Sequence, residues 1–139
     1  MSLGYEGICK LVMQNEEIAI YAYSGANIND NYELRKEHIL DYDGEFLIFK
    51  RCLEETEIHT KIKRKPSGRK YEEIKRIAHL PSVGKHIGNG DVVITKECFN
   101  AFRRHDGMDV DYIAYQLIYK IFQSYQENGC LPEKEGFIQ

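Results

Sequence analysis

An apolar stripe at helical spacing constrains the fold more than any other feature of this sequence. It consists of Val110, Ile113, Ala114, Leu117, Ile118, Ile121, Phe122 and Tyr125. The i, i+3, i+4, i+7 spacing of these residues predicts an amphipathic helix over about 110–127. Asp109 would cap this helix at its start, and Gly129 would close it at its end. We expect the helix to pack its stripe across one face of a sheet.

The first half of the chain predicts strands. Residues 7–13 and 18–24 alternate between apolar and polar side chains and are separated by a short polar turn, which favours a β-hairpin. Residues 46–53 and 58–65 are further strand candidates. Pro66-Ser67-Gly68 would end the last of these strands, because proline cannot donate a hydrogen bond to a sheet.

The second half of the chain favours helices. We expect helices over 71–80 and 97–104, a glycine-rich loop over 83–91 and a short strand over 92–95. Strands therefore come first and helices later. This order predicts an α+β fold, with an N-terminal antiparallel β-sheet of about four to five strands packed by C-terminal helices, the longest at about 110–127.

Length and composition favour a single globular domain over residues 1–139. Of the residues, 42% are hydrophobic and 29% are charged, a balance that argues against disorder. No apolar run reaches the roughly 18 residues that a membrane span needs, and the N-terminus lacks the pattern of a signal peptide. We therefore expect a cytoplasmic protein with no membrane contact. Met1-Ser2-Leu3 resembles a vector-derived leader, so we expect no function of these residues.

The cysteines and histidines, which could bind a metal, are not spaced as they are in metal sites. Cys9, Cys52, Cys98 and Cys130 are far apart in the chain and form no C-x-x-C pair, and the five histidines form no close-spaced pattern. We expect four reduced thiols, with Cys9 and Cys52 buried inside strands. No metal and no cofactor are predicted.

One basic stretch stands out in a chain whose net charge is −3. Residues 61–70 contain no acid and six cations, which are Lys61, Lys63, Arg64, Lys65, Arg69 and Lys70. The rest of the chain holds 13 basic and 22 acidic residues. Strand alternation would place His59, Lys61, Lys63 and Lys65 on one face, which would attract a nucleic acid or an acidic protein. Alternatively, the lysines protect a solvated sheet edge from pairing with other strands.

Two tyrosines of the predicted hairpin offer a second way to contact a nucleic acid. Tyr21 and Tyr23 share one face of the strand over 18–24. If that face is exposed beside the basic stretch, their rings could stack on bases.

A catalytic alternative rests on the glycine-rich loop. Lys85 follows the first glycine of this loop instead of the last, so the loop does not match a P-loop. A metal-independent phosphodiesterase or ribonuclease would need an acid, a base and cations around the phosphate. His86 or His79 could supply the acid or base, and Lys85 beside the basic strand could bind the phosphate. The sequence does not decide whether the protein is an enzyme.

The last helix has an unusual second face. Opposite the apolar stripe, the sequence places Tyr112, Tyr115, Gln116, Tyr119, Gln123 and Gln126, and Lys120 is the only charge between 112 and 126. Tyrosines on such a face suit an interface, because the ring buries area while the hydroxyl stays hydrogen-bonded. The alternatives are a homodimer through Tyr112, Tyr115 and Tyr119, burial by the helices expected over 71–80 or 97–104, and plain exposure.

Together these features favour a small binding or regulatory domain. We expect it to self-associate as a dimer through the tyrosines and to meet an anionic partner through residues 59–70. The phosphodiesterase with His86 and Lys85 is the alternative.

Overall fold

The computed structural model describes residues 4–27, 39–53, 57–77, 80–101, 103 and 109–138 of the 139-residue chain. Five strands form the main sheet, which are β1 (Tyr5–Gln14), β2 (Ile18–Asn27), β3 (Gly44–Phe49), β6 (Val92–Lys96) and β7 (Lys134–Ile138). Their order is β6-β3-β2-β1-β7, and every neighbouring pair is antiparallel. The predicted α+β fold with an antiparallel sheet is confirmed.

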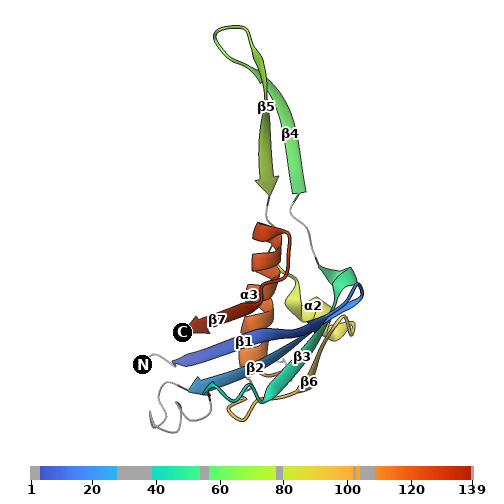
Figure 1. Cartoon of the computed structure of the whole chain (residues 1–139), viewed down its shortest axis with the longest axis vertical. Helices are drawn as coiled ribbons and strands as arrows, with labels where there is room; N and C mark the ends of the chain where they lie inside the picture. Colours follow the sequence, from blue (N-terminus) through green and yellow to red (C-terminus); the bar gives the residue numbers. More distant parts are fainter. Residues whose placement is uncertain are drawn as a thin grey trace.

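The long C-terminal helix, α3 (Tyr112–Asn128), lies across one face of this sheet (Figure 1). Its buried side chains include Ile113, Leu117, Ile118 and Ile121, as the stripe predicted. The helix ends at Gly129, whose φ of 73° and N–H bond to the Tyr125 carbonyl close the last turn. Among the described helices, none combines the length and the hydrophobicity that a membrane span requires.

The N-terminal cap of α3 differs from the prediction by two residues. Asp111, not Asp109, is the capping residue, and its Oδ1 accepts a hydrogen bond of 3.1 Å from the Ile113 N–H. The Asp109 side chain is 95% exposed and pairs with Arg103. Both aspartates fit the sequence pattern of a cap, so spacing alone could not distinguish them.

Two paired glycines allow α3 to approach the sheet closely. Gly7 of β1 lies opposite Gly25 of β2, and Ile113 packs over both. A Cβ at either position would lie 2.8 Å from the Cγ2 of Ile113, and a Cβ at Gly25 would lie 2.4 Å from its Cδ1, both closer than two carbons can pack. The absence of side chains at both positions therefore lets the first turn of α3 pack directly on β1 and β2. We call this contact the glycine seat.

A buried hydrogen-bonded cluster joins α3 to the sheet beside this seat. The Tyr23 hydroxyl donates to Oδ2 of Asp111 over 2.6 Å and accepts from the Cys98 N–H over 3.2 Å. Tyr23 and Asp111 are fully buried. Burial and the neighbouring Asp111 carboxylate raise the pKa of Tyr23, so its hydroxyl stays protonated and keeps donating.

The two strand tyrosines face the core, so the prediction that they could stack on bases is wrong. Tyr21 and Tyr23 both have no exposed area, and the Tyr21 ring stacks on Phe46 with centroids 5.5 Å apart. The Tyr21 hydroxyl donates to the Pro132 carbonyl over 2.6 Å. Alternation alone does not reveal which side of a strand faces inward, and here α3 covers the tyrosine side.

Several predicted elements differ in the structure. Residues 71–77 belong to strand β5 (Lys70–Ile77), not to a helix, because they pair with β4 (Glu57–Arg64). The expected loop over 83–91 begins with a short helix, α2 (Val83–Gly88), and the described residues 97–101 form no helix.

Two further differences concern the main sheet. The strand expected over 46–53 ends at Phe49 and continues as the 3₁₀ turn η1 (Lys50–Cys52), while the strand expected over 58–65 lies outside this sheet. β7, which was not predicted, supplies the fifth strand by pairing with β1.

The glycine seat predicts a local steric effect. In Gly25→Ala, the new methyl group would collide with Ile113, so we expect the free energy of unfolding to fall by about 1–3 kcal/mol. Ile113→Val removes the Cδ1 methyl and should recover part of this loss in the double variant. Gly88→Ala is the control, because a Cβ there meets nothing within 4 Å. Urea denaturation of the wild type and these four variants measures the losses, and strictly additive losses in the double variant would contradict the account.

The buried cluster predicts unequal costs for two similar substitutions. Tyr23→Phe removes the donor to buried Asp111, and we expect a loss of about 2–3 kcal/mol. Tyr21→Phe removes a bond to a backbone carbonyl and should cost about 1 kcal/mol. Equal losses in urea denaturation would show that the hydrogen bond to Asp111 stabilises the fold no more than the bond to the Pro132 carbonyl does.

Candidate nucleic-acid interface

β4 and β5 form a two-stranded hairpin that we call the arm (residues 57–77). The chain reverses at its tip, where the Gly68 N–H donates to the Lys65 carbonyl and the Lys65 N–H donates to the Arg69 carbonyl, both over 2.9 Å. Pro66 suits the second position of such a turn, and Gly68 supplies the positive φ of 85° that closes it. The predicted end of β4 at Pro66-Ser67-Gly68 is therefore confirmed, and the turn brings 70–77 back along 57–64.

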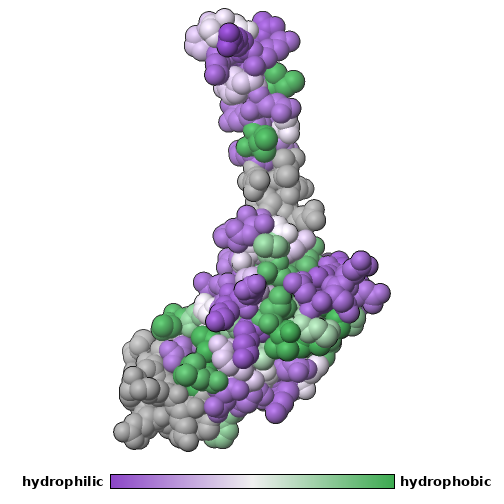
Figure 2. Space-filling model, viewed as in Figure 1, coloured by the Kyte–Doolittle hydropathy of each residue, from purple (hydrophilic) through white to green (hydrophobic). Residues whose placement is uncertain are grey.

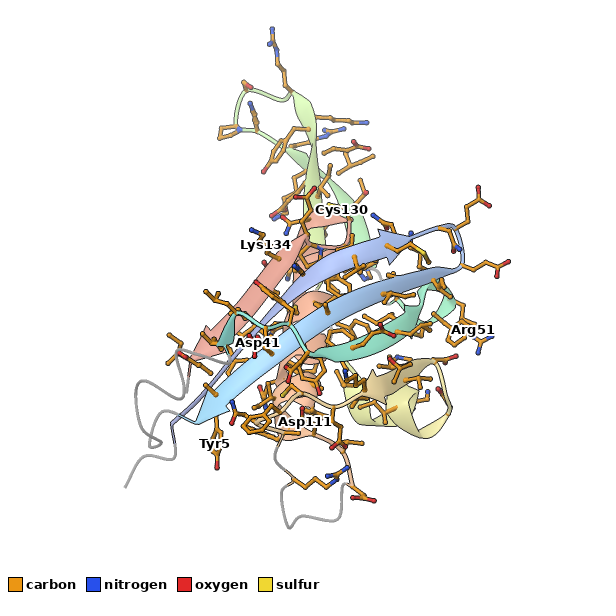
Figure 3. All side chains as sticks on the ribbon, turned by 60° about the horizontal axis from the view of Figure 1, so that its bottom comes forward. Tyr5, Asp41, Arg51, Asp111, Cys130 and Lys134 are labelled. Carbon is orange, nitrogen blue, oxygen red and sulfur yellow. The ribbon has the colours of Figure 1, made fainter. Side chains whose placement is uncertain are left out.

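The arm projects from the body, by which we mean the other described residues (Figure 1). Every side chain from His59 to Lys75 is exposed. Figure 3 shows Asp111 at one end of the body and Cys130 at the other, on the side from which the arm extends. The arm thus has no covering layer over these residues, and its surface is available from all sides.

The arm has two different faces, because opposite residues of an antiparallel pair point to the same side. The lysine face carries His59, Lys61, Lys63, Tyr71, Glu73 and Lys75. The isoleucine face carries Thr60, Ile62, Arg64, Lys70, Glu72 and Ile74. The predicted alignment of His59, Lys61 and Lys63 on one face is confirmed. Lys65 lies toward the same face, since its Nζ is 5.8 Å from the centre of the Tyr71 ring.

Charge separates the arm from the remainder of the chain. The arm holds eight lysine and arginine residues against three glutamates, while the rest holds 11 basic and 19 acidic residues. Glu73 forms an ion pair with Lys63, and that hydrogen bond and charge lower the pKa of the Glu73 carboxyl. Figure 2 shows the arm as mostly hydrophilic, interrupted by separate hydrophobic patches.

The structure does not bring the candidate catalytic residues to the basic stretch. His86 lies buried on α2, with its ring edge-on to Phe122 at 5.7 Å, whereas Lys85 is exposed. α2 belongs to the body, and the basic tip of the arm lies at the far end of the molecule (Figure 1). His79 lies outside the described residues.

The buried His86 instead belongs to a cluster that sequence analysis missed. Its Nδ1 lies 3.7 Å from Oδ2 of Asp91, and the Arg51 Nε donates to Oδ1 of the same carboxylate over 2.7 Å. Arg51 comes from η1 and Asp91 from the turn before β6, so their spacing in the chain gives no signal. The hydrogen bond from Arg51 is the main cause that lowers the pKa of Asp91. The cluster ties η1, α2 and β6 together at the edge of the sheet.

The tyrosine face of α3, defined by Tyr112, Tyr115 and Tyr119, is half-buried. Tyr115 and Tyr119 pack partly against the core, while Gln126, which the sequence placed on this face, is buried. Neither helix that was expected to cover the tyrosines is present: residues 71–77 form a strand of the arm, and the described residues 97–101 form no helix. Self-association and partial exposure stay as the alternatives for this face.

Three of the four thiols are buried. Cys9 and Cys52 are buried in the core, as predicted, together with Cys98, but only Cys9 lies in a strand, because Cys52 belongs to η1. Cys130 is exposed. Burial raises the pKa of both Cys9 and Cys98 to about 12, which keeps them protonated and weakly nucleophilic. All four are free thiols. Within the described residues, no three of the histidine, cysteine, aspartate and glutamate side chains gather to hold a metal ion.

Two open cavities of the body are lined by other residues. One, of about 410 Å³, lies beside Cys9, Tyr42 and Lys134, and the other, of about 230 Å³, lies beside Val93 and Asp109. Neither is lined by His86 or by the arm. The basic arm is therefore the described surface that best combines exposure with concentrated charge.

Comparison with protein-family models, with curated proteins and with solved structures finds no match to this chain.

The Arg51–Asp91 ion pair predicts a stability difference that depends on pH. The pKa of Asp91 is lowered in the folded protein, so the pair stabilises the fold above the ordinary aspartate value of about 3.9, and this stability disappears as the pH falls through the lowered pKa. We therefore expect Arg51→Gln to unfold at a lower temperature than the wild type at pH 7, and we expect this difference to narrow in acid, below the lowered pKa of Asp91.

The matched control for this ion pair is Arg64→Gln, which changes an exposed arginine of the arm. It should leave the unfolding temperature unchanged at both pH values. Arg51 also lies over the Phe49 ring, 4.8 Å from its centroid, and this contact does not depend on Asp91. A difference between wild type and Arg51→Gln that is as large in acid as at pH 7 would contradict a contribution from the Asp91 carboxylate.

Proposed function

We propose that this chain is a non-catalytic binding protein that contacts a nucleic acid through the arm. The observation that carries the proposal is the combination of projection and charge: eight cations on a hairpin whose side chains from 59 to 75 are all exposed. Binding of such cations to phosphates releases condensed counterions, which favours association.

The spacing of the cations supports a repetitive anionic partner. Lys61 and Lys63 are two residues apart on one face, so their Cα atoms lie about 7 Å apart along the strand. Any nucleic acid offers a regular series of phosphates to such a row, whereas an acidic protein does so only where its carboxylates are aligned. The acidic protein is therefore an outcome of the test and not the proposal.

The phosphodiesterase alternative has less support. It requires His86 and Lys85 beside the basic strand, but His86 is buried in the body and the basic tip lies at the other end of the molecule (Figure 1). A general acid or base must come within hydrogen-bond reach of the proton that it transfers. A nucleic acid bound at the tip would not reach His86 unless the protein changed its conformation.

Neutralising one face of the arm should weaken binding strongly. We expect the wild type to bind nucleic acid of mixed sequence with an affinity that falls steeply as salt increases. In Lys61→Gln/Lys63→Gln/Lys65→Gln, the slope of log affinity against log salt should fall by about 2–3, because up to three phosphate contacts are lost. Fluorescence anisotropy with labelled oligonucleotides over a salt series measures the slope.

A body variant with the same charge change serves as the control. Lys85→Gln/Lys96→Gln/Lys134→Gln also removes three exposed lysines, so it should retain the wild-type slope. Equal weakening in the two triple variants would show a diffuse charge effect and would contradict a role of the arm. Absence of binding at low salt would remove the nucleic-acid proposal, and an acidic protein would become the candidate partner.

The tyrosine face supports self-association as a second part of the proposal. Lys120 is the only charge on α3 between 112 and 126, and the three tyrosines keep partly exposed rings on that face. A twofold contact between two such faces would bury these rings while their hydroxyls bond across the interface.

Charge introduced at the centre of the tyrosine face should separate a dimer. Gln116 and Gln123 are half-buried on this face, so Gln116→Glu/Gln123→Glu would bring four carboxylates together across a twofold axis without altering the core. Size-exclusion chromatography with light scattering should give a dimer mass for the wild type at high micromolar concentration and a monomer mass for the variant. A monomeric wild type, or a variant of unchanged mass, would show that this face is not the interface.

A further inference from the structure

The apolar side chains of the isoleucine face are not explained by charge. Ile62 and Ile74 are 68% and 61% exposed, and both lie on the side opposite Lys61 and Lys63. Thr60 pairs with Ile74, so the three side chains form one small apolar strip. The strip covers no core, since every described side chain around it is exposed. A surface used only to attract phosphates would not need it.

The shape of the arm limits what can surround it. Each strand has eight residues, so the ribbon is about 27 Å long, and its strands lie about 4.8 Å apart. A narrow projecting ribbon fits into a groove. The major groove of B-form DNA is about 12 Å wide and admits a two-stranded ribbon, whereas the minor groove is about 6 Å wide. The major groove of double-stranded RNA is too deep and narrow for side chains to read.

We propose that the arm binds in the major groove of double-stranded DNA, with its isoleucine face toward the base edges and its lysines directed at the phosphates of the groove walls. This inference rests on the proposed function and names the kind of nucleic acid. Ile62, Ile74 and the Thr60 methyl would contact thymine methyl groups, which are displayed only in the major groove.

The opposite orientation fits the two faces less well. Lysine has a long flexible stem, so Lys61 and Lys63 can extend past the ribbon to phosphates even when their face points outward. Isoleucine cannot do this, and an outward isoleucine face would stay in water. Glu72 of the isoleucine face suits the base edges as well, because a carboxylate accepts a hydrogen bond from the cytosine amino group there.

Single-stranded nucleic acid is a poorer fit, because proteins hold it mainly by stacking bases on aromatic rings. Tyr71 is the only tyrosine, phenylalanine or tryptophan in residues 57–77, and it lies 5.8 Å from the Lys65 ammonium. One ring cannot form a stacking platform for successive bases.

The test compares four oligonucleotides of one sequence with the full-length protein: duplex DNA, duplex RNA, single-stranded DNA and single-stranded RNA. We expect duplex DNA to bind at least tenfold more tightly than the other three. Dimethyl sulfate footprinting then identifies the groove, because it methylates guanine N7 in the major groove and adenine N3 in the minor groove. Protection of guanine N7 alone is the expected result.

Variants of the two faces test the orientation. Ile62→Ser/Ile74→Ser should weaken binding to duplex DNA about tenfold and leave the salt slope unchanged, because apolar contacts to bases release no counterions. Lys61→Gln should lower the salt slope by about 1. The control is Val12→Ser/Met13→Ser, which removes two exposed apolar side chains of the body (60% and 44% exposed) and should change neither quantity.

The outcomes separate this inference from the proposed function. Protection of adenine N3, or preference for RNA or single strands, would overturn the major-groove inference while the arm still bound nucleic acid. Unchanged affinity in Ile62→Ser/Ile74→Ser, or a changed molecular mass in light scattering, would overturn the orientation and assign the strip to another contact such as a second copy. Failure of all four oligonucleotides to bind would instead contradict the proposed function.

Discussion

The first turn of α3 on the hairpin β1–β2 is the contact on which the rest of the structure depends. Ile113 can sit there because Gly7 and Gly25 leave space opposite each other on neighbouring strands. Beside it, Asp111 caps the helix and accepts a hydrogen bond from the Tyr23 hydroxyl. One buried carboxylate therefore joins the start of the helix to the middle of the sheet. Steric fit and hydrogen bonding thus fix the same end of α3, and the apolar stripe of the helix then covers one face of the sheet.

This packing places the core in the body and leaves the arm without a partner. The residues of the core cluster come from the main sheet, its connections and the helices, and none comes from 59–75, the part of the arm whose side-chain burial is described. An isolated two-stranded hairpin is only marginally stable in water, so the arm gains little from folding alone. Eight cations on such an element also repel one another. A bound polyanion would remove this repulsion and would add contacts along the ribbon. We therefore assign the proposed function to the arm and not to the body.

Sequence periodicity predicted the elements in which one strong pattern had no competitor. The stripe from Val110 to Tyr125 specified α3, and the alternation from His59 to Lys65 specified β4 with its exposed lysines. The prediction of a helix over 71–80 is wrong because Ile74 and Ile77 fit a helix as well as a strand. Only the pairing of residues 70–77 with β4 decides between the two.

Long-range contacts explain what else the sequence did not reveal. Alternation could not show which face of β2 is buried, so it could not reveal that Tyr21 and Tyr23 face the core and not a nucleic acid. β7 depends on pairing with β1, and the cluster of Arg51, His86 and Asp91 depends on three segments that meet only in the fold. For the interface, sequence located the basic residues, but the projection of the arm and its second, apolar face came from the structure.

Amide hydrogen exchange of the full-length protein, with and without duplex DNA, tests the central claim most directly, because it reports on the arm and the body in one measurement. Without DNA, amides of the arm should exchange rapidly and those of α3 and β1–β2 slowly, since only the latter are held by the core. With DNA, protection should increase in residues 57–77 and stay unchanged across α3 and the main sheet. Protection that appears in the body instead of the arm would contradict the account.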